Sequence, residues 1–123
     1  MLTPNMILLF VKKPEVSVKF YHTALGLKAI EKSPTFAMLS LNESTMLSLW
    51  AKAGVEPKVT ALPSAMEIAI QVEDRKSVDQ LFTDWKSQSV AVVRSPTKLN
   101  FGYTFVGLDP DGHRMRVFTP EAP

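Results

Sequence analysis

The stretch that decides the fold is Phe101-Gly-Tyr-Thr-Phe-Val-Gly-Leu-Asp-Pro-Asp-Gly-His-Arg-Met-Arg-Val-Phe118. Its middle, Asp-Pro-Asp-Gly, has the residues that a tight turn requires. The Asp side chain accepts backbone N–H groups, Pro fixes φ, and Gly allows φ to be positive. On either side, aromatic and β-branched residues alternate with small or polar ones, which is typical of strands. We therefore predict two β-strands joined by a short turn.

The second strand of this hairpin carries two arginines on one face. Because side chains alternate along a strand, Arg114, Arg116 and Phe118 share one face, while Met115 and Val117 share the other. If the first of these faces lines a cavity, its arginines are candidate specificity elements.

The composition is that of an ordinary globular domain. The chain has 123 residues, 46% of them hydrophobic and 21% charged, which suits one domain with a buried core. The net charge is only +2 and the 14 Lys and Arg residues are scattered, so we expect no nucleic-acid partner. Without cysteine there is no disulfide, thiolate metal site or thiol nucleophile. The chain shows no signal-peptide pattern and no long apolar run, so we expect a soluble, cytoplasmic protein without a membrane partner.

The two halves of the chain predict the same order of elements. In the first half we expect a strand at 5–11, a helix from Pro14 to Gly26, and strands at 28–31, 35–41 and 45–51. Residues 52–64 lack a hydrophobic period and form the predicted linker. In the second half we expect a strand at 65–72, a helix at 74–88 with Asp74 as its N-cap, a strand at 90–95, and the hairpin.

An offset of 61 positions aligns the halves, matching Val11 with Val72, Phe20 with Leu81 and Tyr21 with Phe82. This self-similarity indicates a duplicated module, although two strand–helix units can also look alike by chance. We therefore predict an α+β domain of two βαβββ modules, at about 4–51 and 65–120.

The chain resembles the vicinal-oxygen-chelate superfamily, which includes glyoxalases, bleomycin-resistance proteins and extradiol dioxygenases. The resemblance is carried by Phe20-Tyr21 and Leu25-Gly26 at the end of the first helix, by the mid-chain linker, and by the Asp-Pro-Asp-Gly hairpin. It implies two modules whose curved mixed sheets enclose a cavity, commonly in a homodimer.

A narrower resemblance is to the phenazine-resistance proteins of that superfamily. It depends on Leu49-Trp50 before the linker, on Leu81-Phe-Thr-Asp-Trp85, and on Phe101-Gly-Tyr-Thr-Phe in the hairpin. In those relatives the tryptophan that matches Trp50 stacks on the ligand. The resemblance therefore implies a planar aromatic ligand.

Enzymes of the superfamily place metal ligands on the first and last strands of each module. Carried over to this chain, those positions are Met6, Ser48, Glu67 and Arg116. Glu67 is the one ordinary ligand among them, because Arg116 stays protonated and Met6 is too soft for a hard divalent ion. His22 and His113 lie elsewhere, and we expect them to be surface or capping residues. We therefore predict no metal and no other cofactor.

The same strand faces predict a site for a flat organic ligand. Its candidate residues are Trp50, Arg116, Glu67, Ser48, Met6, Leu8, Met46, Tyr103 and Phe118. Trp50 would stack on an aromatic ring, and Arg116 would meet a ligand carboxylate or pair with Glu67. Alternatively, Glu67 and Arg116 form only an internal ion pair, and the apolar residues and Tyr103 only pack the core, as we expect for Trp85.

Three functions fit these residues. The first is a metal-free homodimer that sequesters a planar aromatic antibiotic, phenazine-like or otherwise, and so confers resistance. The second is a lyase, isomerase or drug-modifying enzyme in which Glu67 is the general base and Arg116 an electrophilic clamp. The third is a ligand-free scaffold whose own side chains fill the cavity.

Overall fold

The computed structural model describes residues 1–123. They form two compact units, residues 1–61 and 62–123. Each unit contains a strand, a helix and three further strands, in that order. This architecture confirms the predicted α+β fold of two βαβββ modules. The boundary between the units falls inside the predicted linker, which contains the short 3₁₀ turns η1 (Lys52–Gly54) and η2 (Pro63–Ala65).

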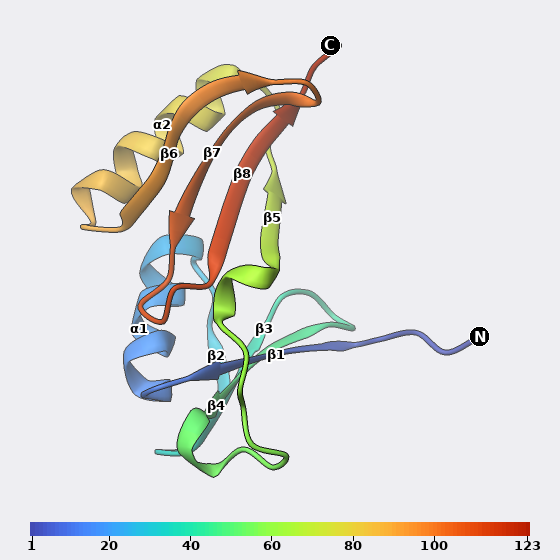
Figure 1. The fold of residues 1–123 in the computed structure, drawn as a ribbon, viewed down its shortest axis with the longest axis vertical. Coiled ribbons are helices and arrows are strands. Elements are labelled where there is room, and N and C mark those ends of the chain that lie inside the picture. Colours follow the sequence, from blue (N-terminus) through green and yellow to red (C-terminus); the bar gives the residue numbers. More distant parts are fainter. The chain divides into compact units, whose positions relative to one another are not determined.

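Unit 1 is a four-stranded mixed sheet with one helix (Figure 1). Its elements are β1 (Met6–Val11), α1 (Pro14–Leu25), β2 (Ala29–Lys32), β3 (Phe36–Ser40) and β4 (Met46–Ala51). The strand order is β1-β4-β3-β2, with β1 parallel to β4 and the other pairs antiparallel.

Unit 2 repeats this topology. Its elements are β5 (Glu67–Gln71), α2 (Arg75–Ser87), β6 (Ala91–Leu99), β7 (Gly102–Leu108) and β8 (Arg114–Pro120). The order is β5-β8-β7-β6, and only β5 and β8 run parallel. In Figure 1 the long strands β6, β7 and β8 curve strongly, and neither sheet closes on itself.

The helix ends are those that the sequence predicts. Pro14 opens α1, and Gly26 ends it in the left-handed conformation, with φ of 71° and its N–H donating to His22 O. Asp74 caps α2, since its Oδ1 accepts the backbone N–H of Ser77 at 2.8 Å.

Each helix buries one face of its own sheet. In unit 1, Tyr21 of α1 is fully buried, as are Leu9, Leu39 and Leu49 on alternating strand positions. In unit 2, Trp85 of α2 is buried as predicted, and its ring meets that of Phe105 edge-on at 5.2 Å.

The turn of the hairpin is closed by Asp109. Its Oδ1 accepts the backbone N–H groups of Asp111 and His113, each at 2.9 Å, and Gly112 has φ of 92°. The prediction that His113 is a surface or capping residue is wrong in one respect. The residue is buried, and its Nδ1 lies 2.7 Å from Asp109 Oδ2, so it is an internal support of the turn.

Strand β6 extends four residues beyond the predicted end at Ser95. The continuation passes through Pro96, which lacks an N–H donor, and it is possible because β6 is an edge strand. The pairing with β7 shifts register twice, between Val92 and Arg94 and between Arg94 and Thr97. These irregularities let β6 curve, and they break the simple alternation of its side chains.

No helix in the structure is long and apolar enough to cross a membrane.

Gly102 provides a test of the β7–β8 packing. A Cβ atom at this position would overlap the backbone carbonyl oxygen of Thr119, which cannot move without disturbing β8. We expect Gly102→Ala to lower the free energy of unfolding by about 1–3 kcal/mol, as other overpacking substitutions do. Gly54→Ala is the matched control, because open space surrounds that position. Urea unfolding of both variants checks this, and equal stabilities would contradict the packing described.

Candidate functional site

The face of the unit 2 sheet that points away from α2 carries a bidentate ion pair. Arg116 on β8 donates from Nε to Glu67 Oε1 at 2.7 Å and from Nη2 to Oε2 at 2.9 Å. Its Nη1 donates to Thr104 Oγ1 at 3.3 Å, and that hydroxyl donates to the Val117 carbonyl. The guanidinium is therefore fixed on two sides, which confirms the predicted Glu67–Arg116 pair.

Arg114 joins the same carboxylate. Its Nη2 lies 2.6 Å from Glu67 Oε2, so one carboxylate serves two guanidinium groups. The hydrogen bond from Arg116 holds the pKa of Glu67 below its ordinary value, and the charges of both arginines add to this effect, whereas partial burial opposes it. Glu67 is therefore ionised, and both of its carboxylate oxygens already accept hydrogen bonds from arginine side chains.

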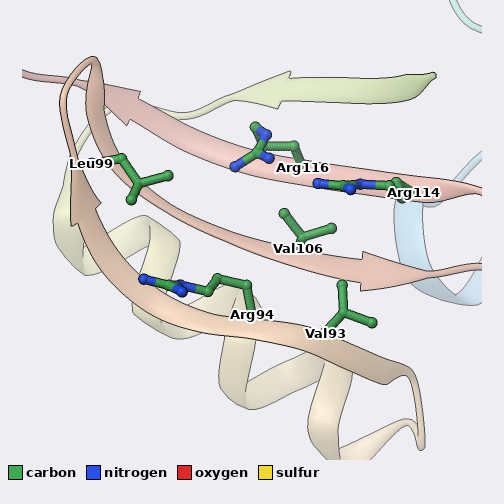
Figure 2. A pocket seen from close by; sticks show the side chains of 6 residues that line it. All are labelled: Val93, Arg94, Leu99, Val106, Arg114 and Arg116. Carbon is green, nitrogen blue, oxygen red and sulfur yellow. The ribbon is translucent and has the colours of Figure 1, made fainter. Parts of the chain in front are cut away.

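A cavity of about 340 Å³ lies on this face of unit 2 (Figure 2). Its volume is near the lower end of the range of roughly 300–1,000 Å³ that is usual for small-molecule sites. The lining residues are Val93, Arg94, Leu99, Val106, Arg114 and Arg116. Figure 2 shows their side chains on the side of the sheet away from the helix. The scaffold hypothesis, in which side chains fill all such space, has no support in unit 2.

Unit 1 has an apolar and aromatic face in the corresponding place. The positions of β1 and β4 that alternate with the buried Leu9, Val11, Leu47 and Leu49 form this face, which carries Met6, Leu8, Phe10, Met46, Ser48 and Trp50. Met6 and Leu8 are 39% and 40% exposed, so they are not the core residues that the alternative interpretation expected. The Trp50 ring is half-buried and meets Phe10 edge-on, with centroids 6.2 Å apart.

Ser48 lies beneath this apolar face. Its side chain is completely buried, and its Oγ has no hydrogen-bond partner in the structure. Ser48 is paired in register with Leu8 on one side and Met38 on the other, so its surroundings are apolar.

The placement of Tyr103 on the open face is wrong. Its hydroxyl donates to Asp79 on α2 at 2.7 Å, and the Arg75 guanidinium lies 4.3 Å from its ring centroid. Tyr103 therefore belongs to the helix side of β7, together with Phe105, as its packing alternative predicted. By contrast, Phe118 is half-buried and packs edge-on against Phe101 at 5.9 Å.

Of the six cavity residues, the sequence predicts only Arg116 as a ligand contact. The other five are Val93, Arg94, Leu99, Val106 and Arg114. Strand alternation puts Arg114 on the correct face without marking it as a contact. Arg94 could not be placed by alternation, because the register shift next to it brings both Val93 and Arg94 to the cavity.

Comparison with known proteins establishes the family. Residues 3–117 match the model of the Glyoxalase/Bleomycin resistance protein/Dioxygenase superfamily. The chain belongs to this superfamily. It is 32% identical, over 94% of this chain and 91% of the relative, to the phenazine antibiotic resistance protein EhpR of Enterobacter agglomerans.

Solved structures show the same fold. A solution NMR structure of a protein from Agrobacterium tumefaciens covers 99% of this chain and 100% of that one, with a TM-score of 0.89 and 39% identity. A crystal structure of a glyoxalase-related enzyme from Fulvimarina pelagi covers 97% and 88%, with a TM-score of 0.83 and 22% identity, and supports the fold alone.

The residues present do not fit the divalent metal that enzymes of this superfamily hold. No group of three or more His, Asp or Glu side chains gathers anywhere in the chain. Glu67, the one carboxylate at the corresponding positions, has both oxygens bonded to arginine, and a nearby guanidinium repels a cation. Met6 is a soft thioether, and Ser48 is surrounded by apolar residues. We therefore derive no chemistry through a metal.

The ion pair makes the stability of unit 2 depend on pH. The pKa of Glu67 is lower in the folded chain than its ordinary value of 4.5, so its stabilising contribution is complete above about pH 4.5. That contribution is lost as the pH falls through the lower folded-state pKa. We expect Glu67→Gln to reduce the free energy of unfolding at pH 7 by roughly 1–2 kcal/mol, with a smaller difference in acid.

Urea unfolding between pH 7 and pH 3 measures this difference. Glu73→Gln is the matched control, because it removes the same charge from an exposed residue for which the structure records no ion pair. A Glu67→Gln variant that differs from wild type by the same amount at every pH would show that the pair does not titrate in this way.

Proposed function

We propose that this protein binds a planar aromatic antibiotic and confers resistance by sequestering it. The similarity to a phenazine antibiotic resistance protein over nearly the full length of both chains supports a role in antibiotic resistance. The observation that carries the choice of ligand is the half-buried Trp50 on an open apolar face of unit 1.

The surroundings of Trp50 suit a flat ring. The rings of Phe10 and Trp50 lie in a T-shaped arrangement rather than stacked on each other, and the exposed Met6 and Leu8 lie along the neighbouring strand. Methionine side chains adapt their shape and favour aromatic partners. Stacking on Trp50 would add about 0.5–1.5 kcal/mol to the free energy from burial of the ring. We propose contacts to Trp50, Met6, Leu8 and Met46.

The alternative of an enzyme that uses Glu67 as its base is not favoured. A general base works best with a pKa near the working pH, whereas pairing with arginine moves the pKa of Glu67 in the opposite direction. The Arg116 guanidinium is likewise occupied by Glu67 and Thr104. Binding without turnover requires neither group to be free. The homodimer expected for this function follows from the resemblance alone.

Fluorescence titration with phenazine tests this proposal, because the chain has only two tryptophans, Trp50 and Trp85. We expect phenazine to quench the emission of a Trp85→Phe variant, in which Trp50 is the sole reporter. Trp50→Ala should weaken binding by about tenfold, through the loss of stacking and of buried area.

Trp85→Phe serves as the matched control, because it changes a buried aromatic residue of α2 in unit 2 and leaves the apolar face of unit 1 intact. Calorimetry should give wild-type affinity for this variant. Binding of phenazine that is equally tight in Trp50→Ala would contradict the proposed role of the indole.

A further inference from the structure

The cavity of unit 2 carries more positive charge than its own residues neutralise. Arg94, Arg114 and Arg116 line it, and Glu67 is the carboxylate that pairs with two of them. Three guanidinium charges against one carboxylate leave a net charge of +2 at the wall. Figure 2 shows Arg94 on β6 and Arg114 and Arg116 on β8, with Val106 of β7 between these strands.

The donors that remain belong to Arg94 and Arg114. Arg94 is exposed, and the structure records no hydrogen bond or ion pair to it. The Nε of Arg114 is buried and has no hydrogen-bond partner. The Arg114 side chain as a whole is 36% exposed, so its guanidinium can meet an acceptor in the cavity. Arg116, in contrast, is fixed by Glu67 and Thr104, so it contributes mainly charge.

The rest of the wall is apolar and consists of Val93, Leu99 and Val106. A fully hydrated ion such as inorganic phosphate gains nothing from these side chains. An organic acid matches both parts of the wall, because its apolar body contacts them while its carboxylate meets an arginine. The planar guanidinium fork is complementary to a carboxylate.

We propose that the unit 2 cavity is a carboxylate-recognition site, in which Arg94 and Arg114 select aromatic acids over neutral aromatic compounds. This inference rests on the proposed function for the kind of ring alone. The site itself lies within unit 2, and Arg94 and Arg114 are its selecting residues. The carboxylate would accept from Arg94 and from the guanidinium of Arg114, with the Glu67–Arg116 pair as the fixed support.

Calorimetric titration with phenazine-1-carboxylate and with neutral phenazine tests the selection. We expect the acid to bind at least about tenfold more tightly, which is the effect of one charged hydrogen bond. Arg94→Gln and Arg114→Gln should each remove most of this preference and leave the affinity for neutral phenazine unchanged. The preference should also shrink with added NaCl, because screening weakens the attraction.

Lys98→Gln is the matched control. It removes a positive charge from the same strand, but Lys98 points to the other side, where its Nζ bonds the Ala122 carbonyl at 2.6 Å. It should leave the preference for the acid intact.

Two outcomes would overturn the inference while the proposed function stands. One is equal binding of the acid and neutral phenazine, and the other is a preference that survives both arginine substitutions. Competition by inorganic phosphate at the same concentration as the acid would also overturn it, because the site would then recognise anions in general. If the acid binds through Arg94 and neutral phenazine does not bind, the carboxylate site stands and stacking on Trp50 fails. If neither compound binds, both proposals fail.

Discussion

The structure depends on one constraint, which is that each four-stranded sheet has a single helix to cover it. A helix hides one face, and in both units that face holds the core residues, such as Leu9 and Leu49 in unit 1 and Phe105 and Val117 in unit 2. The opposite face of each sheet is not covered by a helix of its own unit, so its side chains can contact a ligand. In unit 1 these side chains are apolar and aromatic. In unit 2 they form a basic cavity.

The Glu67–Arg116 pair organises the open face of the unit 2 sheet. A guanidinium takes the oxygens that a divalent ion would need, and Arg114 adds a second positive charge. The hydrogen bond from Arg116 also lowers the pKa of Glu67 and so makes this carboxylate a poor proton acceptor. These features are the reason for proposing a binding role rather than a catalytic one.

The fold could be predicted from the sequence because helix caps, turn residues and strand alternation are local signals. Alternation also placed Arg114 and Arg116 on one face and paired Arg116 with Glu67. Alternation puts Tyr103 and Phe105 on one face of β7, but it does not say which face meets the helix, because both faces of β7 carry apolar residues. The Tyr103 hydroxyl in fact donates to Asp79 of α2. Alternation also failed to place Arg94, whose orientation depends on two register shifts that have no clear sequence signal. The irregular pairing of β6 with β7 is therefore the reason why the cavity residues of β6 could not be predicted from the sequence.

The most direct test of a metal-free binding protein is a calorimetric titration of phenazine-1-carboxylate into protein dialysed against EDTA, repeated with Mg²⁺ or Zn²⁺ restored. The account predicts saturable binding with the same affinity and stoichiometry in every sample. It also predicts that the compound recovered from the cell is chemically unchanged, as mass spectrometry of the released ligand would show. Binding that requires the restored ion, or recovery of a modified product, would contradict it.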